Sequence, residues 1–134
     1  MIVSAYANSN LDIPALPQEM YAIVDDKELV SVVDVGGDDR GAYALGRLSP
    51  KIREENDYDM FLVVNHFRPL TPDAVSTIEV MREIEQAASL TFTGIINNSN
   101  LGAETTAEDV IESQAYAEEI ARLSGLPLVM TTVD

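Results

Sequence analysis

The chain contains no cysteine, no tryptophan and a single histidine among its 134 residues. The absence of cysteine excludes disulfide bonds and thiolate metal sites, and one histidine cannot build a metal centre from several imidazoles. Basic residues are also scarce, because 8 Lys and Arg stand against 23 Asp and Glu and give a formal charge of −15. Such a surface repels nucleic-acid phosphates and anionic lipids, so we expect no nucleic-acid partner.

Long apolar runs are missing as well. No segment approaches the roughly 20 apolar residues that cross a bilayer, and the N-terminal Met1-Ile2-Val3 lacks the basic region of a signal peptide. We therefore expect no membrane span and a cytoplasmic location. The hydrophobic content of 46% is enough for a globular core, and the length predicts one domain over residues 1–134.

Two kinds of apolar segment alternate along the chain. Short runs rich in Val, Ile and Leu predict strands, and longer stretches with apolar residues at helical spacing predict helices between them. The predicted strands are residues 2–5, 29–35, 60–64, 91–97 and 128–133, and the predicted helices begin near Pro17, Asp39, Thr71 and Thr105. This alternation predicts an α/β fold with a mostly parallel sheet of about five strands.

Several residues mark the ends of these predicted helices. Pro50 should bend or end the second helix. Thr71 is the predicted cap of the third helix, and Thr105 with Glu108 forms a predicted capping box for the fourth. Gly125 should end that fourth helix, because glycine readily adopts the left-handed conformation of a helix C-terminus.

Polar and glycine residues follow three of the predicted strands, at the ends where open α/β sheets hold ligands. These three tips are Asp34 with Gly36, Gly37 and Asp38; Asn65 with His66; and the run Asn97-Asn98-Ser99-Asn100. An Asp can bind Mg²⁺ through water, glycines let backbone N–H groups approach a phosphate, and an Asn amide can hydrogen-bond to a base. Each tip could equally be a helix cap or a polar turn, but three tips in one sheet favour a binding site.

The segment Val32-Val33-Asp34-Val35-Gly36-Gly37 resembles the Walker B strand and turn of MinD/ParA/CobQ-type P-loop ATPases of the SIMIBI class. Residues 94–98 resemble the later strand of that family, which ends in an adenine-reading Asn, and Asn98 fits that position better than Asn97. Residues 127–130 resemble the strand before the base-contacting loop. The resemblance covers nearly the whole chain and implies a P-loop NTPase-like, Rossmann-like three-layer fold.

The same resemblance implies ATP and Mg²⁺ as cofactors. Asp34 would hold Mg²⁺ through water, Gly36 and Gly37 would lie near the phosphates, and Asn97 or Asn98 would contact the base. The family also implies ATP hydrolysis, although no catalytic residue is expected in this segment alone.

The chain departs from the family in one large respect, because it contains no Gly-x-x-x-x-Gly-Lys-Ser/Thr phosphate loop. In the family the phosphate-loop strand, its helix and a second strand open the domain, and the strand order is 3-2-4-1-5-6-7. By that analogy this chain holds strands 3 to 7, and we interpret it as a truncated C-terminal portion. We expect it to bind ATP weakly or not at all.

Two alternatives belong to other classes. Asp34-Val35-Gly36-Gly37 also resembles the cofactor loop of methyltransferase-like Rossmann domains, but Asp38 replaces a loop glycine, and Asn65 stands where an acid is expected. A domain without its phosphate loop could instead be a non-catalytic interaction module with an unidentified protein partner. If the retained strands close up in sequence order, their helices cover one face of the sheet. The uncovered face then predicts a homodimer or higher oligomer.

Overall fold

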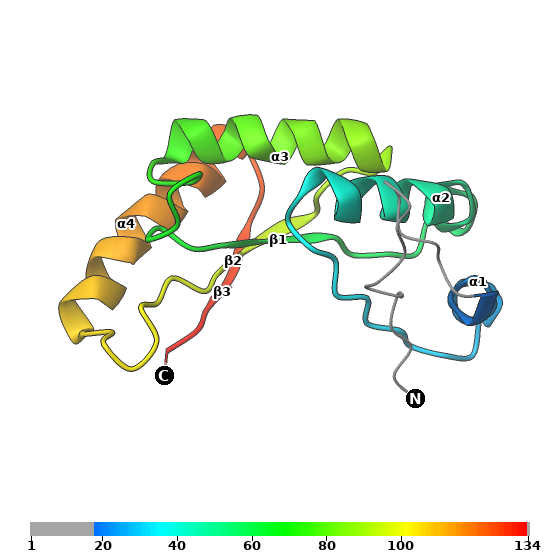
Figure 1. Cartoon of the computed structure of the whole chain (residues 1–134), viewed down its shortest axis with the longest axis horizontal. Helices are drawn as coiled ribbons and strands as arrows, with labels where there is room; N and C mark the ends of the chain where they lie inside the picture. The colour runs from blue at the N-terminus through cyan, green and yellow to red at the C-terminus, as the bar shows by residue number, and fades with distance from the viewer. Residues whose placement is uncertain (1–17, 134) are drawn as a thin grey trace. The chain divides into compact units, whose positions relative to one another are not determined.

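The computed structural model describes residues 18–133, and the predicted strand 2–5 lies outside the described residues. The elements are α1 (Gln18–Asp25), α2 (Asp39–Glu55), β1 (Phe61–Val64), α3 (Ala74–Ala88), β2 (Gly94–Asn97), α4 (Ala107–Ser124) and β3 (Leu128–Thr131) (Figure 1). They form two compact units: residues 18–58 with 84–90, and residues 59–83 with 91–133. No helix in the described range is long and apolar enough to cross a bilayer.

The second unit contains a parallel sheet with the strand order β1-β2-β3. Leu62 lies opposite Ile95 and Val64 lies opposite Asn97, whereas the register between β2 and β3 shifts between Ile95 and Ile96. Helices α3 and α4 connect the consecutive strands. The predicted α/β class with a parallel sheet is therefore confirmed, with three strands in the described part of the chain.

The prediction of about five strands is wrong for the described residues, because residues 29–35 belong to no helix or strand. Val30 and Val32 in this segment are almost fully exposed to solvent. Valine favours strands because its branched side chain packs against neighbours on a pleated sheet. The sequence supplies the valines, but no described strand pairs with the segment.

One face of the sheet packs against the helices. Right-handed crossovers that step in the same direction place their helices on the same side of a sheet. The hydroxyl oxygens of Thr77 on α3 and Tyr116 on α4 are 2.7 Å apart, so these two helices are in contact. Leu62, Val64 and Ile95 are buried. The core of this unit therefore lies between the strands and α4, and α3 contacts α4 at its Thr77.

Helix α2 continues through Pro50 to Glu55, so the proline does not end the helix, which was one of the two expected effects. Proline lacks the N–H that would bond to the Gly46 carbonyl one turn earlier. The buried Ser49 hydroxyl donates to that carbonyl instead, at 2.9 Å. A side chain thus replaces the backbone donor, and Asn56 ends the helix in a left-handed conformation.

The caps of the later helices are shifted from their predicted positions. Asp73, rather than Thr71, accepts a hydrogen bond from the Ser76 N–H at the start of α3. The capping box of α4 is Thr106 with Asp109, one residue beyond the predicted pair. Gly125 ends α4 with a φ of 73°, as predicted.

Candidate functional site

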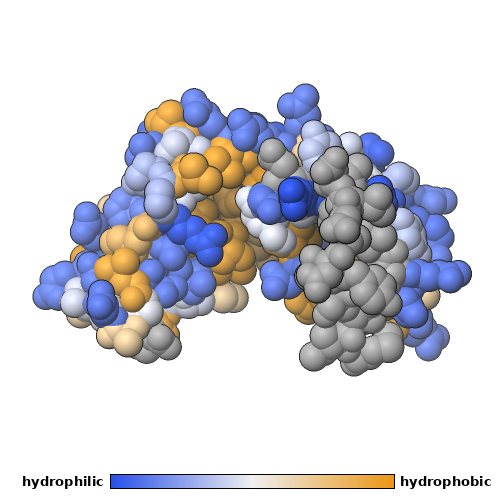
Figure 2. All heavy atoms as spheres, in the orientation of Figure 1, coloured by the Kyte–Doolittle hydropathy of each residue, from blue (hydrophilic) through white to orange (hydrophobic). Residues whose placement is uncertain are grey.

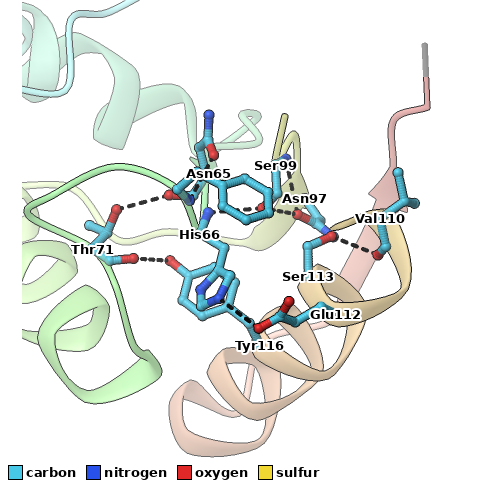
Figure 3. Close-up of polar contacts among 10 residues, drawn as sticks. Asn65, His66, Thr71, Asn97, Ser99, Val110, Glu112, Ser113 and Tyr116 are labelled. Atoms are coloured by element: carbon cyan, nitrogen blue, oxygen red, sulfur yellow. Dashed lines mark hydrogen bonds and ion pairs between the residues drawn. The ribbon is translucent and has the colours of Figure 1, made fainter. Parts of the chain in front are cut away.

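The carboxyl ends of β1, β2 and β3 are connected by hydrogen bonds within the second unit. The Asn65 side-chain amide donates to the Asn100 carbonyl at 3.2 Å, and the His66 backbone N–H donates to the Ser99 hydroxyl at 2.9 Å. Figure 3 shows Asn65 and His66 close to Ser99 and Asn97. Two of the three predicted tips are therefore brought together.

Asn97 lies at the centre of this arrangement and is fully buried. Its side-chain amide donates to the Ser113 hydroxyl on α4 at 3.0 Å. Its side-chain oxygen accepts from the Ser99 N–H at 3.2 Å and from the Ser99 hydroxyl at 2.6 Å. The side chain of Asn97 thus ties the end of β2 to α4 and to the following loop, and it offers a ligand no exposed surface.

Asn98, the next residue, is exposed. Its side-chain oxygen accepts a hydrogen bond from the Thr132 hydroxyl at 2.5 Å, while its Nδ2 donates to no residue in the range 18–133. The Thr132 backbone N–H also donates to the Asn97 carbonyl at 2.9 Å, which joins the end of β3 to that of β2. The geometry favours Asn98 over Asn97 as the residue that faces a ligand.

A hollow of about 160 Å³ adjoins this pair. Its lining residues are Asn98, Ser99, Asn100, Thr105, Val110, Thr132 and Val133. Sequence reasoning did not select Thr132, although it lies near the carboxyl end of the predicted strand 128–133 and directly follows the observed β3. The rule that directed attention to the ends of the other strands would have found it.

His66 is held mainly by ring contacts. Its ring centroid lies 4.7 Å from that of Tyr116 and 5.3 Å from that of Phe67. Its Nε2 is 3.9 Å from a Glu112 carboxylate oxygen, and its buried Nδ1 has no hydrogen-bond partner among the described residues. These contacts favour a packing role over that of a catalytic base.

Tyr116, on α4, contacts the His66 ring and is held by hydrogen bonds of its hydroxyl. Its hydroxyl donates to the Thr71 carbonyl at 3.0 Å and lies 2.7 Å from the Thr77 hydroxyl. Burial raises the pKa of the Tyr116 hydroxyl, with the two hydrogen bonds acting in the opposite direction. The tyrosine therefore stays protonated and can serve as a donor in this structural contact.

The remaining predicted site residues belong to the first unit. Asp34, Gly36 and Gly37 lie in the segment before α2, and Asp34 is exposed. Asp38 is the N-cap of α2, because its carboxylate accepts from the Gly41 N–H at 2.9 Å. A Cβ on Gly41 would lie 2.3 Å from the Gly36 carbonyl oxygen, so the turn approaches the helix closely. Sequence reasoning did not identify Gly41 as a position of close approach. The available indication was that a glycine stood inside a predicted helix.

Asp34 is the residue of this segment that the family resemblance assigns to Mg²⁺. Within residues 18–133, no three His, Asp or Glu side chains are grouped to hold an ion. A single exposed carboxylate supplies one ligand oxygen, and Mg²⁺ commonly takes its others from water and substrate phosphates. Asp34 therefore fits Mg²⁺ only as one ligand of a set completed by water and a nucleotide.

Comparison with known proteins identifies no relative. No protein-family model matches the chain, and no match is found among curated proteins or solved structures.

Proposed function

We propose that this chain is the C-terminal, base-binding portion of a MinD/ParA/CobQ-like P-loop ATPase domain. In this proposal Asn98 reads the adenine ring, and Asp34 with Gly36 and Gly37 belongs to the Mg²⁺ and phosphate side of the site. The chain itself lacks the phosphate loop. It therefore binds ATP weakly or not at all on its own, and it does not hydrolyse ATP unaided.

The observation that carries the proposal is the exposed Asn98 amide beside Thr132 in the hollow at the ends of β2 and β3. A carboxamide can pair with adenine through two hydrogen bonds, donating to a ring nitrogen and accepting from the exocyclic amine. The Nδ2 of Asn98 has no acceptor among the described residues, and its oxygen has a second lone pair besides the one that Thr132 uses. Guanine presents acceptors at both corresponding positions, so the pair favours adenine.

The strand arrangement gives independent support. In the family order 3-2-4-1-5-6-7, strands 5, 6 and 7 are neighbours, and β1, β2 and β3 have that sequential order. Residues 29–35 correspond to family strand 4, whose neighbours are strands 1 and 2. Neither of these is among the strands that the chain retains by this analogy. The loss of these two neighbours accounts for the valine-rich segment 29–35, which pairs with no described strand.

The proposal is tested by titrating the ¹⁵N-labelled chain with adenosine and, separately, guanosine. Adenosine at millimolar concentration should shift the Asn98 side-chain amide and the backbone signals of Thr132 and Val133, while guanosine should shift them less. ATP should bind no more tightly than adenosine, because the amide and lysine cradle that neutralises its phosphates is missing.

Asn98→Asp is the sharpest variant for this test. Aspartate has nearly the same shape and still accepts from Thr132, but it lacks the Nδ2 donor. Asn56→Asp makes the same change of charge at the end of α2, at a residue that does not line the hollow. Only the first variant should abolish the shifts. Equal responses to the two nucleosides, or micromolar Mg²⁺-dependent ATP binding by calorimetry, would contradict the proposal and favour another class, such as an interaction module.

A further inference from the structure

The face of the sheet opposite α3 and α4 is apolar and open to solvent. Phe61, Val63, Val129 and Met130 are between 41% and 58% exposed. Figure 2 shows apolar surface over the region where Figure 1 draws the three strands. The neighbours Val129 and Met130 both lie on this side because the register shift between β2 and β3 leaves Val129 as an extra residue on β3. We call these four residues the open face.

Geometry around Gly94 shows that the open face is continuous across the strands. Side chains alternate between the two sides of a strand, so Phe61 and Val63 lie opposite the buried Leu62 and Val64. A Cβ on Gly94 would lie 2.7 Å from Val129 Cγ2 and 3.2 Å from Phe61 Cδ1. Phe61 on β1 and Val129 on β3 therefore approach each other over the glycine of β2.

Charge distinguishes this surface from the rest of the chain. The twelve residues of the strands are FLVV, GIIN and LVMT, and none of them is charged. The whole chain nevertheless has a formal charge of −15, which makes two copies repel each other through most surfaces. At the open face, two copies can approach without bringing carboxylates from these strands together.

We propose that the open face is a homotypic interface, which pairs with the same face of a second copy around a two-fold axis. A two-fold axis brings the same surface from each copy together, so an uncharged apolar face is complementary to itself. Two packed sheets lie about 10 Å apart, which lets side chains of this size interdigitate. This inference uses none of the residues that line the hollow of the proposed nucleotide site.

The exposed apolar area of the open face is comparable to the apolar centre of a dimer interface. With about 150–200 Å² for each residue when fully exposed, the four residues leave roughly 350 Å² in solvent on each copy. Pairing two copies removes about 700 Å² of surface at these residues alone. Standard interfaces bury about 1,200–2,000 Å² in total, of which a little over half is apolar. The open face can therefore supply most of the apolar centre of such an interface, with the polar rim coming from its surroundings.

The test measures association of the 134-residue chain by sedimentation equilibrium. We expect a reversible dimer, at twice the chain mass of 14.6 kDa, with a Kd in the micromolar range. Val63→Lys should raise the Kd by at least about 100-fold, because pairing would bury an unpaired charge from each copy. Val75→Lys is the matched control, since Val75 is 63% exposed on α3 and Val63 is 58% exposed on β1.

A second variant covers the case in which lysine prevents folding. Val63→Thr keeps the branched shape that suits a strand and replaces one methyl group with a hydroxyl. It should preserve the circular dichroism spectrum and still weaken the dimer by about 10-fold. A monomer at about 100 μM, a concentration well above the expected Kd, would overturn the proposal. Equal weakening by Val75→Lys and Val63→Lys would also overturn it.

Discussion

Replacement of the buried Asn97 by alanine should destabilise the chain severely, whereas the same change at the adjacent Asn98 should be mild. Asn97→Ala removes the acceptor of both the Ser99 N–H and the Ser99 hydroxyl, and the donor to Ser113. Ser99 and Ser113 are themselves buried, so water cannot replace these bonds easily.

The magnitude follows from the groups left without partners. Each buried polar group that loses its partner costs about 1–3 kcal/mol. Asn97→Ala leaves two Ser99 donors without an acceptor and opens a small cavity where the side chain was. Together these changes should lower the free energy of unfolding by about 3–5 kcal/mol. The total stability of a domain is about 5–15 kcal/mol, so this is a large fraction. Asn98→Ala removes one exposed hydrogen bond to Thr132 and should cost less than about 1 kcal/mol.

Urea unfolding followed by circular dichroism measures both values. With a slope of about 2 kcal/mol per M, the midpoint for Asn97→Ala should fall by roughly 2 M relative to the unmodified chain. All samples need one protein concentration, because a dimer gains stability with concentration. Similar midpoints for the two variants would refute the assignment of a structural role to Asn97 and an exposed role to Asn98.

Two further predictions concern the helix starts. Gly41→Ala should lower stability by about 1–3 kcal/mol, because its Cβ would meet the Gly36 carbonyl oxygen at 2.3 Å. Gly37→Ala has no atom within 4 Å of the new Cβ and should be nearly neutral in the same urea unfolding assay. Hydrogen bonds from the backbone and side chain of Thr106 lower the pKa of the Asp109 carboxyl. The stability that this adds is present above the unfolded pKa of about 3.9 and is lost as pH falls through the lower folded pKa. Asp109→Asn should therefore be less stable than the unmodified chain near neutral pH. The gap should narrow on acidification in unfolding curves measured from pH 6 to about pH 2, and a constant gap would refute this linkage.

Local sequence patterns determined much of the secondary structure. The apolar runs at residues 60–64, 91–97 and 128–133 contain the three observed strands, although each observed strand is shorter than its prediction. Gly125 ends α4 as expected, because the left-handed conformation depends on the residue itself. The same patterns also identified two of the strand ends that meet in the second unit.

Strand partners and side-chain hydrogen bonds decided what the apolar patterns could not. A strand requires a partner, so the valines of residues 29–35 could not make that segment a strand by themselves. Helix α2 passes Pro50, and the Ser49 hydroxyl bonds to the Gly46 carbonyl that the proline leaves free. The pattern of apolar residues does not reveal that a side-chain hydroxyl takes the place of a backbone N–H.

The difference between Asn97 and Asn98 also required the tertiary structure. Adjacent residues on a strand point to opposite sides, so a shift of one position exchanges buried and exposed side chains. The pairing of Val64 with Asn97 and the contact with Ser113 on α4 bury Asn97 and leave Asn98 beside Thr132. The sequence alone determined that amides follow β2, whereas the strand register and the position of α4 decided which amide is exposed.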